Sequence, residues 1–270
     1  MTRNATRGWL YMALAIGWTW AFWVAAAASG ASFGSPIQMA LLIAGAAGVP
    51  GMALLLLFTA GSAAERRDYW QRLVELRRIR LGGWLAIILL PPALALLGVA
   101  AHILQTGAWP DFAPLRSFAA APLTLLPFLV FIFLFGPLPE ELGWRGYALP
   151  KLQTAHGALA AALLLGAAHA VWHLPLFFME GSHQASLGFL SPAFWRYMVS
   201  VVFLSVIMSA LFNASAGSTL SAILIHFTNN LTGELLRLPD MAEWVRMGAM
   251  GLVALTLIAA TRGRLFEKRS

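Results

Sequence analysis

The chain of 270 residues is divided into apolar windows of about 20 residues, the length that a helix needs to cross a bilayer. In hydrocarbon every backbone N–H and C=O must find its partner inside the protein, so such windows are expected to fold as α-helices. The sequence therefore predicts an all-α, polytopic integral membrane protein with about eight transmembrane helices in one bundle. The windows are 8–29, 37–61, 83–104, 122–138 with a helical continuation to about 152, 157–178, 194–212, 217–236 and 241–260.

Composition agrees with a membrane protein and narrows the chemistry. Hydrophobic residues make up 60% of the chain and charged residues 11%, whereas soluble domains carry about 25% charged residues. The net charge of +7 comes from basic residues between the apolar windows, a pattern that indicates membrane orientation and not nucleic-acid binding. The chain has no cysteine, which excludes a disulfide, a thiolate nucleophile and a Cys-ligated metal. We therefore expect a membrane as partner and no nucleic acid.

Basic residues also predict the orientation. With the N-terminus inside, fourteen of the eighteen Lys and Arg residues fall in internal segments, as expected of cytoplasmic loops. The run 9–28 is longer than the core of about 7–15 residues in a signal peptide, so we expect it to be the first span. The sequence predicts a multi-pass protein of the cell (plasma) membrane with both termini cytoplasmic. The four external basic residues are Arg116, Arg196, Arg237 and Arg246.

The segment 65–80 is the most highly charged part of the chain. It carries apolar residues at helical spacing among six arginines and three acids, which predicts a helix on the inner membrane surface. A lipid-sensing or substrate-docking element is one reading of this pattern, but we favour a loop that fixes orientation.

Most polar residues that lie inside the apolar windows are on three late helices. Ionisable groups at membrane depth are rare and mark functional sites, because burying one costs about 2.5 kcal/mol or more unless it is paired or hydrated. The first helix holds Glu140, Glu141 and Arg145, the second holds His169 and His173, and the third holds His226, Asn229 and Asn230.

Helical spacing assigns these side chains to faces. His169 and His173 are four residues apart, so they project from one side of their helix. Glu141 and Arg145 are also four apart, with the acid first, which is the favourable order for an intrahelical ion pair. Glu140 lies about 100° round the helix and is left freer. Gly136 and the two prolines that follow it should kink or restart the helix just before the acids.

Each feature has a structural alternative, since a lone histidine or a lone Glu-Arg pair can simply hold helices together. The three sets together fit a carboxylate base, a water-positioning imidazole and an oxyanion-stabilising pair. Other protease chemistries do not fit. The chain has no His-Glu-x-x-His, and no serine in or beside a span has a Gly-x-Ser-x-Gly context. The three aspartates, which are Asp68, Asp111 and Asp240, fall in predicted loops.

The ordered motifs resemble those of the CPBP family, which comprises the type II CAAX prenyl endopeptidases and related bacterial membrane proteins. The family's Glu-Glu-x-x-x-Arg motif is present as Glu140, Glu141 and Arg145. Its second-motif histidine is His173, and its His-x-x-x-Asn motif runs from His226 to Asn230. The sequence has no internal repeat and no linker long enough to separate domains, which predicts a single transmembrane domain, 1–270. The resemblance implies a catalytic core at about 120–235.

The resemblance also implies an activity and roles for the motif residues. In such an enzyme the first acid and the second-motif histidine activate water, while the third-motif histidine and asparagine stabilise the oxyanion. We therefore expect an intramembrane endopeptidase that hydrolyses a peptide bond in a membrane-associated protein or peptide, lipidated or not. The alternatives are a proton-coupled transporter and a non-catalytic membrane scaffold. The expected catalytic residues are Glu140, Glu141, Arg145, His173, His226 and Asn230.

One position departs from the family pattern and bears on metal. The family favours Phe four residues before the second-motif histidine, where this chain has His169. The family has been described both as metalloproteases and as metal-independent glutamate proteases. Asn230 is a poor zinc ligand and a good oxyanion donor, so we expect no cofactor to be required. The alternative is one divalent metal ion, with zinc as the first candidate, held by Glu140, His169, His173 and His226.

Overall fold

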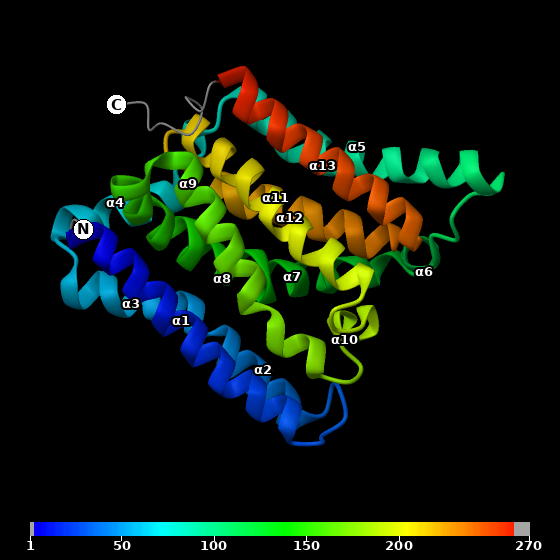
Figure 1. The fold of residues 1–270 in the computed structure, drawn as a ribbon, viewed down its shortest axis with the longest axis horizontal. Coiled ribbons are helices and arrows are strands. Elements are labelled where there is room, and N and C mark those ends of the chain that lie inside the picture. Colours follow the sequence, from blue (N-terminus) through cyan, green and yellow to red (C-terminus); the bar gives the residue numbers. More distant parts are fainter. Residues whose placement is uncertain (1–2, 262–270) are drawn as a thin grey trace.

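The computed structural model describes residues 3–261, and within that range it contains helices and no strand (Figure 1). The prediction of an all-α polytopic membrane protein is confirmed. The elements are α1 (Arg3–Ala28), α2 (Pro36–Ala46), α3 (Gly48–Ala60), α4 (Ala63–Val74), η1 (Leu76–Arg78), α5 (Leu81–Thr106), α6 (Ala113–Ala120), η2 (Pro122–Thr124), α7 (Leu125–Phe135), α8 (Pro137–Gly143), η3 (Trp144–Ala148), α9 (Leu149–Trp172), η4 (Leu174–Phe178), α10 (His183–Leu187), α11 (Pro192–Ala214), α12 (Thr219–Leu236) and α13 (Asp240–Thr261).

Every predicted window is helical, but the number of distinct spans differs from the prediction. In the part of the chain that the structure describes, six stretches are long and apolar enough to cross a membrane. Two of the predicted windows belong to one of these stretches, Pro122–Phe178. The window at 217–236 is α12, which is not among the six because its histidine, asparagines and glutamate lower its hydropathy.

The fourth predicted span, 122–138, is broken near its C-terminal end. α7 has 11 residues, so it rises about 16 Å and cannot by itself cross a hydrocarbon core of about 30 Å. It stops at Gly136, whose φ of −133° and ψ of −101° are not helical. The helix restarts at Pro137, as the prolines predict, and continues until a second break at Gly157, with φ of 69° and ψ of 168°.

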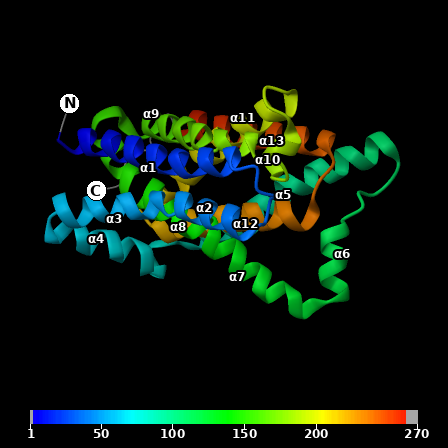
Figure 2. The same cartoon turned by 90° about the horizontal axis from the view of Figure 1, so that it is seen from below.

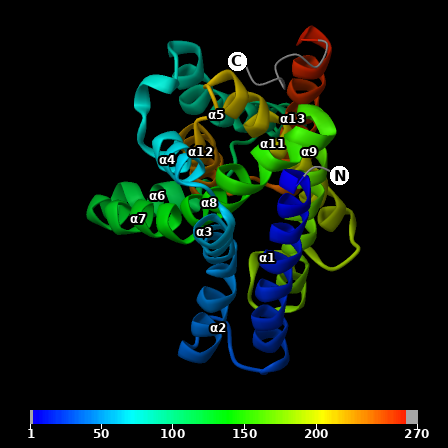
Figure 3. The ribbon, with the colours of Figure 1, turned by 90° about the vertical axis from the view of Figure 1, so that its left-hand side faces the viewer.

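The long helices form one bundle, with α9 packed on α11 and on α1, and α13 packed on α5 and α11 (Figure 1). α2 and α3 lie against α1 on one flank. α6 and α7 project from the bundle as an arm (Figures 2 and 3). The apolar side chains of α7 are largely exposed, as expected of a surface that faces lipid.

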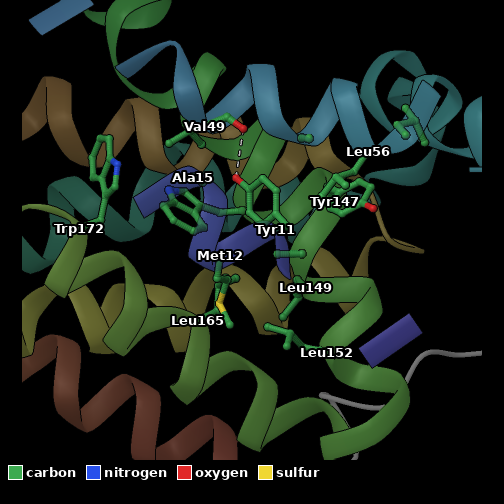
Figure 4. Close-up of a cluster of buried hydrophobic side chains, with 14 of the residues drawn as sticks. Tyr11, Met12, Ala15, Val49, Leu56, Tyr147, Leu149, Leu152, Leu165 and Trp172 are labelled. Carbon is green, nitrogen blue, oxygen red and sulfur yellow. Dashed lines mark hydrogen bonds between the residues drawn. The ribbon is translucent and has the colours of Figure 1, made fainter. Parts of the chain in front are cut away.

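A buried cluster around Tyr11 fixes the segment that follows the helix break (Figure 4). The Tyr11 hydroxyl donates to the carbonyl of Val49 at 3.2 Å, which ties α1 to α3. A Cβ on Gly143 would lie 1.9 Å from the Tyr11 hydroxyl and 2.6 Å from Val49 Cγ1. Only glycine fits here, so α1 and α3 clamp the end of α8 directly against the core.

In Figure 1 the start of α1 and α4 lie at the left of the bundle, and the end of α13 lies at its top. Four basic residues that support the predicted orientation lie outside the described residues: Arg262, Arg264, Lys268 and Arg269.

Candidate active site

The helix restart places Glu140 in the first turn of α8, where its backbone N–H donates to the carbonyl of Gly136 at 3.2 Å. Pro137 and Pro139 suit this turn, because the first backbone N–H groups of a helix have no intrahelical acceptor. The turn puts Glu140 and Glu141 about 100° apart around the helix axis, so they enter different surroundings.

Glu141 forms the predicted ion pair with Arg145, and both side chains are 0% exposed. Arg145 Nη1 donates to both carboxylate oxygens of Glu141 at 3.0 Å. Its other terminal nitrogen donates to the Ser205 hydroxyl on α11 at 2.8 Å, and that hydroxyl donates to the Ala162 carbonyl at 3.1 Å. The pair is therefore joined to α9 and α11, which gives it a role in holding the bundle.

His226 on α12 completes the surroundings of Glu141. Its Nδ1 lies 2.8 Å from Glu141 Oε1. Because Glu141 faces the cation of Arg145, the carboxylate accepts and His226 donates from Nδ1. Nε2 of a neutral His226 then carries a lone pair, and this nitrogen becomes a donor only when the ring is protonated.

Glu140 pairs with His169, the position at which this chain departs from the family pattern. His169 Nε2 lies 2.9 Å from Glu140 Oε2. The His169 ring is buried between Trp144, at a centroid distance of 5.2 Å, and His173, at 5.0 Å. The Glu140 side chain is 14% exposed, so it remains within reach of water.

His173, at the C-terminal end of α9, has its tautomer fixed by the backbone. Its Nδ1 donates to the carbonyl of His169 at 2.9 Å, because a carbonyl can only accept. Nε2 is thus left with a lone pair that can accept a hydrogen bond from water or bind a metal. The i, i+4 spacing predicted that both rings share a face, and the structure stacks them at an interplanar angle of 22°.

Asn230 reaches the site from α12. A Cβ built on Gly136 would lie 3.8 Å from its Nδ2, which places the amide beside the helix break that precedes Glu140. Asn230 Oδ1 accepts from Asn229 Nδ2 at 3.3 Å. The structure thus brings the predicted residues of three helices together around the start of α8.

Helix α4 supplies contacts to the site that the sequence did not predict. Directly after α8 comes η3 (Trp144–Ala148), a π-helical turn of 5 residues, and such turns are frequent at functional sites. The Tyr69 hydroxyl donates to the Leu142 carbonyl at 3.0 Å, and Arg72 Nη2 donates to the Gly146 carbonyl at 2.9 Å. α4 therefore braces the chain just before the π-helical turn, at Leu142, and the middle of the turn, at Gly146.

Burial explains why these two side chains act as donors. Burial raises the pKa of the Tyr69 phenol, which therefore stays neutral, and its hydroxyl can donate. Burial lowers the pKa of the Arg72 guanidinium, while the carboxylate of Asp68, 2.9 Å from Arg72 Nε, opposes the shift. The sequence signal for this face was present in the i, i+3 spacing of Tyr69 and Arg72 behind a capping box at Ser62.

The predicted metal ligands do not gather around one point. The structure divides them into two triads that share Glu140, and in each the ligand atoms lie within 4.8 Å of one another. Glu140, His169 and His173 form a set with the composition of a catalytic zinc site. Glu140, Glu141 and His226 form the other, in which Glu141 is already bonded to Arg145.

Comparison with known proteins shows what the sequence around this site resembles. Residues 122–232 match the family model described as "Type II CAAX prenyl endopeptidase Rce1-like". A curated relative, CAAX prenyl protease 2 of Methanococcus maripaludis, is 28% identical over 237 residues, covering 87% of this chain and 86% of the relative. Both comparisons thus show similarity to the type II CAAX prenyl endopeptidases. The matched range 122–232 contains all three motifs, whereas Tyr69 and Arg72 lie outside it.

Proposed function

We propose that this protein is an intramembrane endopeptidase that uses Glu140 as the general base. The observation that carries the proposal is the different bonding of the two adjacent acids. Glu141 is fully buried against Arg145 and His226, whereas Glu140 is partly exposed and faces His169. Glu140 is therefore the motif acid that can reach water and exchange a proton with it.

The hydrolytic step follows from the positions of Glu140 and His173. A water molecule between them donates one hydrogen bond to Glu140 and one to the free Nε2 of His173. Its oxygen attacks the carbonyl carbon of the scissile peptide bond, and its proton passes to Glu140. When the C–N bond breaks, Glu140 returns that proton to the leaving amine, so the base is regenerated.

Negative charge on the carbonyl oxygen is stabilised by the third motif. Asn230 Nδ2 is a neutral donor beside the helix break. His226 is held by its Nδ1 contact with Glu141 at 2.8 Å, and its Nε2 would donate to the oxyanion as an imidazolium. We therefore assign Glu141 and Arg145 to holding His226 and the helix, and not to attack on the substrate.

We propose that the reaction requires no metal. Glu140, His169 and His173 fit zinc by ligand type, and His173 has the backbone partner on its second nitrogen that metal-binding histidines usually have. A zinc ion held there would act as a Lewis acid and lower the pKa of a bound water. It would also engage Glu140 as a ligand, and Glu141 is committed to Arg145, so neither acid of the motif would remain as a base.

The metal proposal is tested with purified protein in detergent after exhaustive chelation. Cleavage should persist, and added zinc should not increase it. Activity that disappears on chelation and returns with one equivalent of zinc would establish the metalloprotease alternative instead.

The substrate is expected to reach the site from the membrane. The exposed apolar face of α7 leads to Gly136, directly before Glu140, so a lipid-anchored or membrane-embedded chain can approach along it. This face is formed by Leu126, Val130, Phe131, Leu134 and Phe135. The relative named as a CAAX prenyl protease makes a prenylated C-terminal peptide the first substrate to test.

The deciding experiment compares three peptides that share one scissile sequence. One is prenylated, one is unmodified and one carries a transmembrane anchor. Mass spectrometry should show cleavage of anchored peptides by the wild-type protein and none by Glu140→Ala. Proton-coupled solute flux in proteoliposomes without peptide cleavage would favour the transporter. The absence of both flux and cleavage would favour the non-catalytic scaffold.

We also propose that the protein lies in the cell (plasma) membrane, with both termini and α4 on the cytoplasmic side. A reporter fused after Ser270 should give a cytoplasmic signal, and one inserted at Gly107, between α5 and α6, should give an external signal. The opposite pair of signals would reverse the orientation without affecting the assignment of the site.

A further inference from the structure

A chain of hydrogen bonds runs from α13 to the oxyanion side of the site. Arg246 Nη2 donates to Asn229 Oδ1 at 2.8 Å, and Asn229 Nδ2 donates to Asn230 Oδ1 at 3.3 Å. Arg246 Nη1 in turn donates to both carboxylate oxygens of Glu243, at 3.1 and 3.2 Å. Arg246 and Glu243 lie outside residues 122–232, the part that matches the family model.

In this chain of hydrogen bonds, Arg246 fixes which atom of each asparagine donates and which accepts. An arginine has donors and no acceptor, so the atom of Asn229 that faces Arg246 must be its oxygen. The amide nitrogen of Asn229 then faces Asn230 and can only donate, so Asn230 must present its oxygen in return. The amide nitrogen of Asn230 is left for the substrate, on the side of Gly136.

The guanidinium at the head of this chain is itself held in place. The side chain of Arg246 is 12% exposed, and Glu243 also lies 3.7 Å from Arg196 Nη1 on α11. Arg246 lies along the face of α12 where Gly233 has no side chain, since a Cβ there would be 3.5 Å from Arg246 Nη1. Contacts with two neighbouring helices thus fix the direction from which Asn229 is approached.

We propose that Asn229 and Arg246 are positioning residues that lock the Asn230 amide with its nitrogen toward the developing oxyanion. This inference rests on the proposed function. An asparagine amide can turn by 180°, and the turned form would present an oxygen to the oxyanion and repel it. The lock removes that turned form before the substrate arrives, which is the preorganisation that oxyanion stabilisation requires.

The test is a pair of substitutions at one position. Asn229→Asp keeps the shape of the side chain and replaces its bond to Arg246 with a charged pair, but it supplies no donor to Asn230. The Asn230 nitrogen should turn toward the new carboxylate, and its oxygen should then face the oxyanion. Asn229→Ala removes both bonds and leaves the Asn230 amide free to adopt either orientation.

We expect Asn229→Asp to be the more stable of the two variants and also the less active. Asn229→Asp should melt at or above the wild-type temperature and lose about 100-fold in kcat, comparable to the loss of one oxyanion donor. Asn229→Ala should melt lower and lose less than about tenfold. KM for an anchored peptide should change little in either, because the contact is made in the transition state.

Two further variants complete the design. Arg246→Lys retains a donor-only cation and should recover most of the kcat that Arg246→Met loses. Glu234→Gln, on an exposed side chain one turn beyond Asn230, is the control and should match the wild type.

A purely structural role for Asn229 predicts that the isosteric aspartate is the milder change. Cleavage by Asn229→Asp that equals or exceeds that of Asn229→Ala would therefore overturn the inference and leave the proposed function intact. Absence of cleavage by the wild-type protein would overturn the proposed function, and the inference with it.

Discussion

Two neighbouring carboxylates occupy regions of opposite character in this protein. Glu141 is 0% exposed and bonded to Arg145 and His226, so it lies in a closed network that links α8, α11 and α12. Glu140 is 14% exposed and is bonded to His169 on α9. Glu140 and Glu141 are adjacent in the helix, yet the carboxylate of Glu141 holds the bundle together and that of Glu140 is accessible to water.

Desolvation makes this division consequential. A fully buried ion pair is costly to assemble, and removing one partner is strongly destabilising because the other charge stays buried alone. A partly exposed carboxylate keeps access to water and can change its protonation during a reaction. The following changes test whether the two regions are separable.

The largest effect is expected from Glu140→Gln. The amide keeps the size of the side chain and can still accept from His169, but it cannot take a proton from water. We expect a loss of about 100- to 10,000-fold in kcat, the usual contribution of a general base, with an unchanged melting temperature. Peptide cleavage and thermal melts in the same detergent measure the two quantities.

Glu141→Gln should give the reverse result. It leaves the cation of Arg145 buried without a counter-charge, which costs about 3 to 5 kcal/mol, so folded yield and melting temperature should fall. Activity per folded molecule should fall less than in Glu140→Gln. If Glu140→Gln were instead the less stable of the two, the division between a catalytic and a structural acid would be wrong.

A smaller effect is expected where α4 braces the Glu141 region. Tyr69→Phe removes the hydroxyl that donates to the Leu142 carbonyl, and the loss of such a hydrogen bond costs about 1 kcal/mol. The matched control is Trp70→Phe, because Trp70 is the next residue on α4 and is 41% exposed. Equal melting temperatures for the two variants would show that the bond to Leu142 contributes no stability.

Much of this division could be predicted from the sequence. The spacing of Glu141 and Arg145 predicts their ion pair, and the prolines before Glu140 predict the helix restart. Both features depend on neighbours in the chain, so local geometry determines them. The hydrophobic windows predicted the helices for the same reason.

The remaining features depend on contacts between distant segments. A π-helical turn leaves no hydropathy signal, and the acceptors of Tyr69 and Arg72 are backbone carbonyls, which every residue carries. Arg246 was counted as one of four external basic residues, although it bonds Asn229 inside the bundle. The second break, at Gly157, was not predicted, because hydropathy reports burial in lipid and not continuity of the helix.

A third glutamate, Glu65, extends the comparison to the surface and should give the smallest effect. It lies in the first turn of α4, and its carboxylate is 34% exposed beside Lys151, at 3.0 Å. Partial burial raises the pKa of Glu65, but the Ser62 backbone N–H and Lys151 together outweigh it, so the pKa lies below its usual 4.5. Because the pKa of Glu65 is lowered in the folded state, the stability that its carboxylate contributes is present above about pH 4.5 and is lost as the pH falls through the lowered value.

Glu65→Gln keeps the capping box and removes only the charge, so at neutral pH the substitution should cost less than about 1 kcal/mol. Melting temperatures of Glu65→Gln and the wild type should differ slightly at pH 7 and converge at acid pH, whereas a difference that persists in acid would assign the effect to packing.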